Sequence, residues 1–212
     1  MDLFADITPT NVNILPDVVL LKGFALAHET LLLADLQAVI AQAPLRHMMT
    51  KMGFNMSAAM TNCGDLGWTS DRKGYRYNPL DPLTNLPWPA MPASFKQLAT
   101  LAALEAGFKH FQPDACLINQ YKVGASMGLH QDKNECDYSQ PIVSVSLGIP
   151  AVFQFGGKLR TDKTIKIPLM HGDVIVWGGE ARQHFHAIMP LKMSQHETLG
   201  AYRCNLTFRM AG

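Results

Sequence analysis

Long apolar runs are missing from this 212-residue chain, and none approaches the roughly 20 residues that a membrane-spanning helix needs. The stretch 1–6 is acidic and lacks the basic and then apolar order of a secretory signal peptide. Cysteine is scarce: the four residues stand far apart without a C-x-x-C pair, which argues against a disulfide framework or a zinc knuckle. We therefore expect a cytoplasmic protein that is not bound to a membrane.

An excess of basic residues is missing as well. Lysine and arginine number 18 against 17 acidic residues, so the net charge of +1 gives no support for a nucleic-acid partner, although a local basic patch remains compatible with it. The hydrophobic share of 48% excludes a disordered chain. Because no repeat, low-complexity tract or linker divides the sequence, we expect a single domain over 1–212. The sequence patterns differ between 1–112 and 113–212.

The first half contains the helical patterns. Apolar residues recur at helical spacing over 29–43, where Pro44 ends the pattern, and again over 94–106. Ser94 is the expected N-cap of the second helix and Gly107 its C′ residue. The stretch between the two helices, 78–92, is rich in proline and asparagine and is expected to be a loop.

The second half contains short apolar or alternating segments separated by turn residues, which is the pattern of β-strands. The segments are 115–121, 142–147, 151–155, 164–169, 174–177, 184–189 and 201–209. Seven strands after a helical start predict a mainly β fold with flanking helices, either a β-sandwich or a jelly roll.

His130-Gln131-Asp132 is a candidate metal motif. Residues two apart in an extended segment point to the same side, so His130 and Asp132 could bind one ion. Two imidazoles and one carboxylate are the ligand set of non-haem Fe(II) oxygenases. Either His184 or His186 could supply the second imidazole, because spacing alone does not choose between them. The His-x-Asp pair by itself is a weak signal of a metal site.

The last predicted strand carries a polar face. Arg203, Asn205, Thr207 and Arg209 alternate with apolar residues, which is also typical of a strand with one solvated face. Arginine, however, grips a carboxylate through two parallel hydrogen bonds, so two arginines on one face suit a dicarboxylate. Asn119 and Tyr121 could add neutral donors or could simply decorate an edge strand.

Aromatic and basic residues alternate over 68–77, which reads as a hairpin with its turn at 71–74. The aromatic side chains there are compatible with ordinary packing. They are also compatible with the stacking platforms that hold bases of single-stranded nucleic acid.

Several separate blocks of the chain, in matching order and spacing, resemble the bacterial AlkB DNA-repair dioxygenases. They include LHQDK at 129–133 and NLTFR at 205–209, together with 2–6, 60–64, 66–68, 113–119, 142–148 and 172–180. The resemblance implies a double-stranded β-helix (a jelly roll) that uses Fe(II), O2 and 2-oxoglutarate. It also implies that 1–112 forms helical support and a substrate lid, while 113–212 forms the catalytic core.

The resemblance implies a role for each candidate residue. His130, Asp132 and His186 become the metal ligands, and His184 becomes a neighbour. Arg203 is expected at the distal carboxylate of 2-oxoglutarate. The same site is expected to include Asn119, Tyr121, Asn205 and Arg209.

The implied reaction is oxidative demethylation of bases such as 1-methyladenine and 3-methylcytosine, which releases formaldehyde, succinate and CO2. A base inside a duplex cannot reach a buried metal, so the partner is alkylated DNA that is single-stranded or has its base flipped out. Trp68 is expected to stack on the base, and Met56 and Met60 to line the lid. The other expected substrate contacts are Tyr75, Arg76, Tyr77, Asn134 and Arg160.

Asn134 departs from the family pattern, which has an acidic residue two positions after the metal aspartate. Losing that carboxylate leaves the lesion preference open but not the type of reaction. Two alternatives also stay open at this point: the same oxygenase chemistry on RNA, protein or a small molecule, and a non-catalytic jelly-roll metal protein. We expect a monomer.

Overall fold

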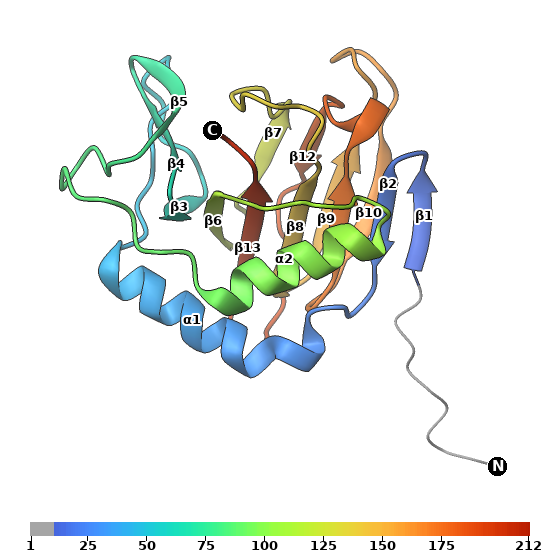
Figure 1. Ribbon diagram of the computed structural model, residues 1–212, viewed down its shortest axis with the longest axis horizontal. Coiled ribbons are helices and arrows are strands. Elements are labelled where there is room, and N and C mark those ends of the chain that lie inside the picture. Colours follow the sequence, from blue (N-terminus) through green and yellow to red (C-terminus); the bar gives the residue numbers. More distant parts are fainter. Residues whose placement is uncertain (1–10) are drawn as a thin grey trace.

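Two antiparallel sheets face each other in the computed structural model, which describes residues 11–212. The 2–6 block of the resemblance lies outside these residues. The larger sheet has the strand order β1-β2-β11-β8-β13-β6-β3 and the smaller has β10-β9-β12-β7 (Figure 1). The strands of the larger sheet are β1 (Asn11–Leu15), β2 (Val18–Leu21), β11 (Val174–Trp177), β8 (Ile142–Gly148), β13 (Tyr202–Arg209), β6 (Ala115–Lys122) and β3 (Ala59–Gly64). Those of the smaller are β10 (Ile165–Leu169), β9 (Ala151–Phe155), β12 (His186–Ile188) and β7 (Met127–His130).

A third, two-stranded sheet stands apart from these layers. It is the hairpin of β4 (Gly67–Asp71) and β5 (Gly74–Asn78), which Figure 1 shows beside the open end of the two facing sheets. The turn falls between Asp71 and Gly74, as the sequence predicts, and Gly74 has a positive φ of 110° that only glycine adopts readily.

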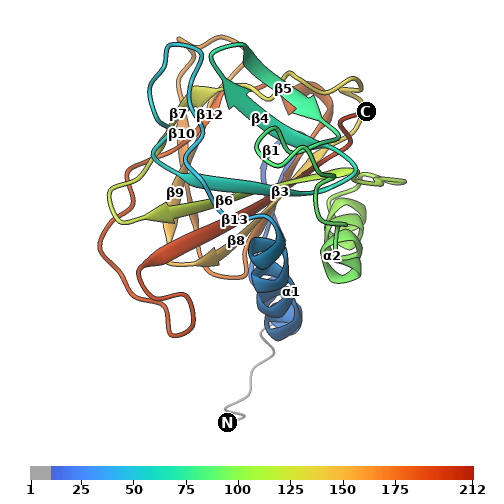
Figure 2. The ribbon, with the colours of Figure 1, turned by 90° about the vertical axis from the view of Figure 1, so that its left-hand side faces the viewer.

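The larger sheet buries side chains on both faces. Its inner face and the smaller sheet enclose one core, which includes Ile142, Phe153 and Trp177. Its outer face packs against α1 (Glu29–Gln42) and α2 (Ala93–Glu105), which lie side by side in Figures 1 and 2. This layering explains why β8 is buried at every position instead of alternating.

The mainly β fold with flanking helices is confirmed. Helix α1 ends one residue earlier than predicted, and α2 begins and ends one residue earlier. Gly107 has a φ of +92°, as its predicted C′ position requires. Ser94 is not the N-cap: that position is Pro92, and the Ser94 hydroxyl instead donates to the Asp35 carboxylate of α1, so it links the two helices.

The seven predicted strands are all present, with ends displaced by at most two residues. Two short 3-10 helices, Leu26–His28 and Gly179–Ala181, complete the fold. The sequence prediction missed β7 in the second half and β1, β2 and β3 in the first half, which is therefore less helical than expected. Within residues 11–212, no helix is both long enough and apolar enough to cross a lipid bilayer.

Candidate metal and cosubstrate site

Two histidines and one aspartate meet between the facing sheets. His130 ends β7 and His186 begins β12, and the two residues are paired directly across these antiparallel strands. Asp132 follows β7 by two residues, with its carboxylate 3.8 Å from Nε2 of each imidazole. One ligand atom from each residue lies within 4.8 Å of the others, a spacing that can hold one metal ion. The sequence motif therefore becomes a three-residue site only through strand pairing.

Backbone carbonyls orient both imidazoles. Nδ1 of His130 lies 2.8 Å from the Gly128 carbonyl, and Nδ1 of His186 lies 3.0 Å from the His184 carbonyl. When Nδ1–H donates to a carbonyl, the lone pair of a neutral ring is on Nε2, which is the atom that faces Asp132. The two rings are thus held in the tautomer that binds metal.

His184 lies outside this cluster. Its ring packs against Phe155, with centroids 5.5 Å apart, and its Nδ1 is buried without a hydrogen-bond partner. The structure therefore brings His186, and not His184, to His130 and Asp132.

The electrostatics of the site keep its ligands ready for a cation. Burial alone would raise the pKa of Asp132, but the charge of Arg209, aided by His186 and His130, outweighs burial and holds that pKa well below its usual range. Arg209 donates from Nε (3.0 Å) and Nη2 (2.6 Å) to the same oxygen, Oδ2. Burial, and then the charge of His130, lower the pKa of His186 to about 3. At neutral pH the cluster therefore offers a carboxylate and a neutral imidazole.

The cluster borders a cavity of about 710 Å³. That volume is within the usual range for small-molecule sites, so a cosubstrate and a flat ring could both fit. Both sheets and the hairpin supply its wall. The candidate residues that line it are Met56, Trp68, Tyr75, Asn119, Tyr121, His130, Asp132, Asn134, Arg160, His186, Asn205, Thr207 and Arg209.

Arg203 lies beneath this wall and is 1% exposed. Its Nη2 donates to Ser146 at 3.0 Å and its guanidinium lies 5.4 Å from the centre of the Tyr121 ring, but its Nε and Nη1 have no hydrogen-bond partner. Burial lowers the pKa of Arg203. A buried guanidinium with two unused donors is costly unless an anion approaches it. The residues present therefore fit a carboxylate ligand here.

The polar face of β13 is buried, so the alternative of a solvated face is wrong. Asn205 donates to Ser144 (2.8 Å) and to the Val145 carbonyl (2.9 Å), and Thr207 donates to Asn205 Oδ1. Asn119 and Tyr121 are buried too, which excludes surface decoration. The Asn119 Oδ1 atom has no partner, whereas the amide of Asn205 is already satisfied within the sheet.

The hairpin presents two aromatic rings to the cavity. Trp68 and Tyr75 stack with centroids 5.6 Å apart and planes 11° apart. Arg76 does not line the cavity: its guanidinium forms two hydrogen bonds with Asp71 in the same hairpin, at 2.9 and 2.7 Å. The pairing with Arg76 lowers the pKa of Asp71 to about 2.

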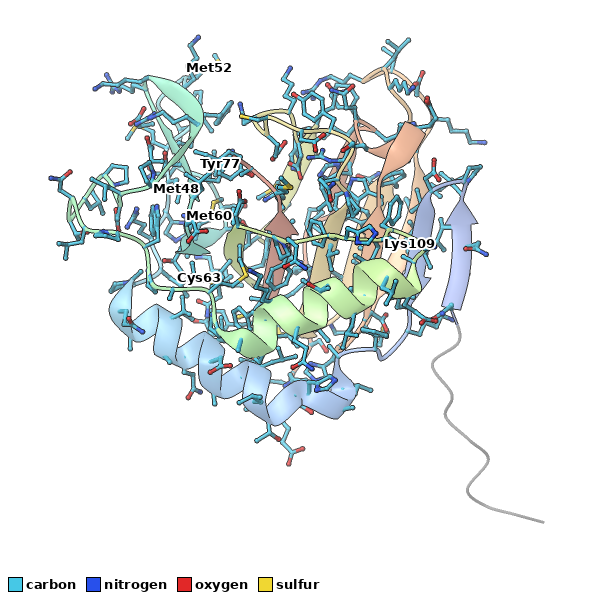
Figure 3. The ribbon with its side chains drawn as sticks, in the orientation of Figure 1. Met48, Met52, Met60, Cys63, Tyr77 and Lys109 are labelled. Carbon is cyan, nitrogen blue, oxygen red and sulfur yellow. The ribbon has the colours of Figure 1, made fainter. Side chains whose placement is uncertain are left out.

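Tyr77 points from the hairpin towards the two facing sheets (Figure 3) and does not line the cavity. Its hydroxyl donates to Glu135 at 2.7 Å. Burial raises the pKa of Tyr77 well above its usual value, so the hydroxyl stays protonated and able to donate. Met56 lines the cavity, but Met60 is fully buried in β3 and does not, which corrects the expectation for Met60.

Asn134 and Arg160 border the cavity from loops. Strand β7 ends at His130, so Asn134 lies in the loop that follows this strand. Its Oδ1 lies 3.4 Å from the Trp68 indole Nε1, which donates to it. The Arg160 guanidinium lies 5.1 Å from the centre of the Phe185 ring.

Sequence reasoning missed two buried charged residues behind the cluster, Glu135 and Arg182. Arg182 donates to the backbone carbonyls of Asp132 and Gln140, both at 3.0 Å, and its Nη2 lies 3.2 Å from Glu135. The signal available was Glu135 itself, an acidic residue three positions beyond a predicted metal ligand. Nothing in the pattern marked Arg182.

The comparisons with known proteins agree with this geometry. The family model described as the 2OG-Fe(II) oxygenase superfamily matches residues 17–209. The chain is 54% identical over 211 residues to alpha-ketoglutarate-dependent dioxygenase AlkB of Salmonella typhimurium, covering all of this chain and 98% of that protein.

More distant proteins are similar as well, one in sequence and one in fold. The AlkB homolog of Caulobacter vibrioides is 45% identical over 182 residues, which cover 84% of this chain and 81% of the homolog. The solved structure of OsALKBH1 superposes with a TM-score of 0.82 at 27% identity, covering 95% of this chain and all of that one. The chain therefore belongs to the 2OG-Fe(II) oxygenase superfamily and, within it, to the AlkB-type dioxygenases that depend on Fe(II), 2-oxoglutarate and O2.

Proposed function

We propose that this dioxygenase demethylates alkylated bases in nucleic acid. The observation that carries the proposal is the His130, Asp132 and His186 cluster in a cavity that also includes the stacked Trp68 and Tyr75 rings. This arrangement supports a flat aromatic substrate held within reach of a redox metal. A methyl group on a ring nitrogen has no acid–base route to removal, which is why the protein needs such a centre.

In the proposed site, Fe(II) is held by His130, Asp132 and His186. Bound Fe(II) and 2-oxoglutarate supply the oxidising power with which O2 hydroxylates a methyl carbon. One oxygen atom of O2 enters the methyl group and the other enters succinate, while CO2 leaves. The hydroxymethyl group then leaves the base as formaldehyde, and the ring nitrogen is restored.

Arg203 holds the distal carboxylate of 2-oxoglutarate in this proposal. Its two unpartnered donors support that role, and Tyr121 and Asn119 offer a hydroxyl and an amide beside it. Arg209 keeps Asp132 oriented through Oδ2, which leaves Oδ1 for the metal. Asn205 contributes by fixing β13 to β8, since its amide is already bonded there.

The base stacks on Trp68 and Tyr75 in this proposal. Asn134 meets the edge of the base, and Arg160 meets the backbone of the strand. Arg76 acts through the Asp71 pairing that stiffens the hairpin turn, and Tyr77 acts through Glu135.

The preferred partner is alkylated DNA, either single-stranded or with its base flipped out, because the metal cluster lies between two sheets beyond the reach of a paired base. Methylated RNA offers the same rings and is the second substrate to test. We infer a monomer, because one chain supplies every residue of the proposed site. A cytoplasmic location is consistent with four free cysteines, three of them buried.

The test is mass spectrometry of an oligonucleotide that carries one 3-methylcytosine. The protein is incubated with Fe(II), 2-oxoglutarate, ascorbate and air, and the expected product has lost one CH2 unit. Asp132→Asn is the matched control, because it keeps the shape but removes the anionic ligand. Parallel reactions use RNA of the same sequence and the free methylated nucleoside. Succinate formation that none of these substrates stimulates would contradict the proposed function.

A further inference from the structure

Glu135 is a buried carboxylate that does not line the cavity. Its Oε1 accepts the hydroxyl of Tyr77 at 2.7 Å and lies 3.4 Å from Nε of Arg209. Its Oε2 lies 3.2 Å from Nη2 of Arg182. The side chain of Glu135 is 2% exposed, and that of Arg182 is also 2% exposed, so water does not screen this group of charges.

The three partners come from separate parts of the chain. Tyr77 belongs to β5 of the hairpin, Arg209 ends β13, and Arg182 follows the 3-10 helix Gly179–Ala181. One carboxylate therefore joins the hairpin that borders the cavity to β13 of the larger sheet, where Arg209 binds the carboxylate of Asp132. Figure 3 shows Tyr77 at the side of the hairpin from which this link is made.

Arg209 and Arg182, which both lie beside Glu135, also bind Asp132. Arg209 binds Oδ2 of Asp132 and Arg182 binds its backbone carbonyl, so two cations and two anions form a balanced buried group. Removing the charge of Glu135 would leave two guanidiniums with one carboxylate, an imbalance that buried groups tolerate poorly. Arg209 would then be held by Asp132 alone, and the orientation of the metal ligand would change with it.

We propose that Glu135 is a positioning residue that couples the base-binding hairpin to the metal carboxylate. This inference rests on the proposed function, because it takes nucleic acid as the occupant of the hairpin face. A base that stacks on Trp68 and Tyr75 fixes the hairpin and therefore Tyr77. Tyr77 holds Glu135, which holds Arg209 and Asp132 in the orientation that binds metal. Metal binding and oligonucleotide binding should consequently strengthen each other by the same factor.

The experiment measures this factor without turnover, in the full chain under anaerobic conditions. Fe(II) is titrated in the presence of 2-oxoglutarate, with and without an oligonucleotide that carries 1-methyladenine. Tryptophan fluorescence reports the metal, because the Trp177 ring lies 5.1 Å from that of His186. The reciprocal effect, that of Fe(II) on the affinity for the oligonucleotide, is measured by fluorescence anisotropy of a labelled oligonucleotide with and without Fe(II).

The variants are Glu135→Gln, Tyr77→Phe and, as a matched control, Glu197→Gln on the surface. In the wild type each ligand should tighten the other by about fivefold or more. Tyr77→Phe should bring the factor close to one, and it should weaken Fe(II) binding without oligonucleotide less than Glu135→Gln does. Glu135→Gln should abolish the coupling and also weaken Fe(II) binding, and Glu135→Asp should restore part of both. Glu197→Gln should behave as the wild type does.

Three outcomes would overturn the inference: no coupling in the wild type, unchanged coupling in Tyr77→Phe, or coupling that survives Glu135→Gln while only the thermal stability falls. If Glu135→Gln fails to fold, Tyr77→Phe still decides, since it removes a single hydroxyl. The experiments distinguish failure of this inference from failure of the proposed function. Coupling without loss of CH2 from the oligonucleotide would contradict the function alone, whereas demethylation without coupling would contradict the role of Glu135.

Discussion

Arg203 is the residue in which charge, burial and unused hydrogen-bonding capacity coincide most clearly. Two of its guanidinium nitrogens are buried without partners. In Arg203→Lys the bidentate fork is lost while the charge remains. Losing one charge-assisted hydrogen bond costs roughly 1.5–3 kcal/mol, so the apparent Kd for 2-oxoglutarate should rise about ten- to hundred-fold. A 2-oxoglutarate titration of succinate formation checks this, and an unchanged titration would remove Arg203 from the cosubstrate site.

The three residues proposed as metal ligands should be individually indispensable. His130→Ala, Asp132→Ala and His186→Ala each remove one donor of the cluster and should abolish turnover and Fe(II) binding. His184→Ala is the internal control, since it changes a neighbouring histidine that packs on Phe155, and it should retain Fe(II) binding. Fe(II) binding by the three ligand variants and by His184→Ala is measured as the iron content after anaerobic loading and desalting. Loss of iron in His184→Ala with retention in His186→Ala would reverse the assignment.

Asn134 should determine part of the lesion preference. Its side chain borders the cavity and accepts from the Trp68 indole, so a substitution there alters the edge that a stacked base would meet. Asn134→Asp adds a negative charge that favours the cationic rings of 1-methyladenine and 3-methylcytosine over the neutral 1-methylguanine. The gain should be modest, because the side chain is exposed and water screens the charge.

A competition assay with mixed lesions measures the preference of Asn134→Asp against the wild type. Asn85→Asp, in an exposed loop outside the cavity wall, controls for the added charge. An identical ranking of lesions in all three proteins would show that Asn134 does not read the base. Specificity would then have to come from Trp68 and Tyr75.

Strand β6 carries Tyr121, a buried tyrosine that is harder to ionise in the folded protein than in the unfolded chain. Burial raises the pKa of Tyr121 to about 12, against about 10 in an unfolded chain. Between these values the unfolded state has lost the proton that the folded state keeps, so stability from this group is complete below pH 10 and falls as pH rises towards 12. The fall is about 1.4 kcal/mol per pH unit across that window.

Tyr121→Phe removes this pH dependence, because the variant has no phenol to ionise. Urea unfolding of both proteins should show a constant difference in the free energy of unfolding from pH 7 to 9. The difference should then narrow by about 1.4 kcal/mol by pH 11. A difference that stays constant up to pH 11 would mean that Tyr121 ionises as easily in the folded protein as in the unfolded chain.

The elements that sequence reasoning found and missed differ in where their stability comes from. Helix α1 and strands β8, β9 and β11 carry clear apolar patterns, and these were predicted with ends displaced by no more than one residue. Strand β3, with the sequence AMTNCG, has no alternation and becomes a strand because it pairs with β6 along its whole length. Strand β7, with the sequence MGLH, depends similarly on pairing with β12. Pairing with distant partners overrides weak local preference there.

The candidate site shows the same division. His130 and Asp132 could be found because two ligands occur two residues apart, and Arg203 and Arg209 because they alternate on one strand. The choice of His186 required the pairing of β12 with β7. Glu135 and Arg182 could not be found together, because 46 residues lie between them in the chain and only the fold brings their side chains to 3.2 Å.

At the scale of the whole molecule, a net charge of +1 leaves nucleic-acid binding to local patches of charge. The hairpin tip carries Arg72 and Lys73, both exposed, on the element that also presents Trp68 and Tyr75 to the cavity. Helix α2 and the loop after it carry Lys96 and Lys109, also exposed; Figure 3 shows Lys109 away from the hairpin. These two pairs allow equal changes of net charge at different places.

The salt dependence of oligonucleotide binding should distinguish the two pairs. Each phosphate contact with a single strand contributes about 0.7 to the slope of log affinity against log salt concentration. Arg72→Gln/Lys73→Gln should therefore reduce the slope by about 1.4 if both side chains contact phosphates. Lys96→Gln/Lys109→Gln removes the same charge and should leave the slope of the wild type. Anisotropy titrations at several salt concentrations measure all three proteins. Equal slopes for the two double variants would mean that the strand does not cross the hairpin tip and that the backbone follows another face of the molecule.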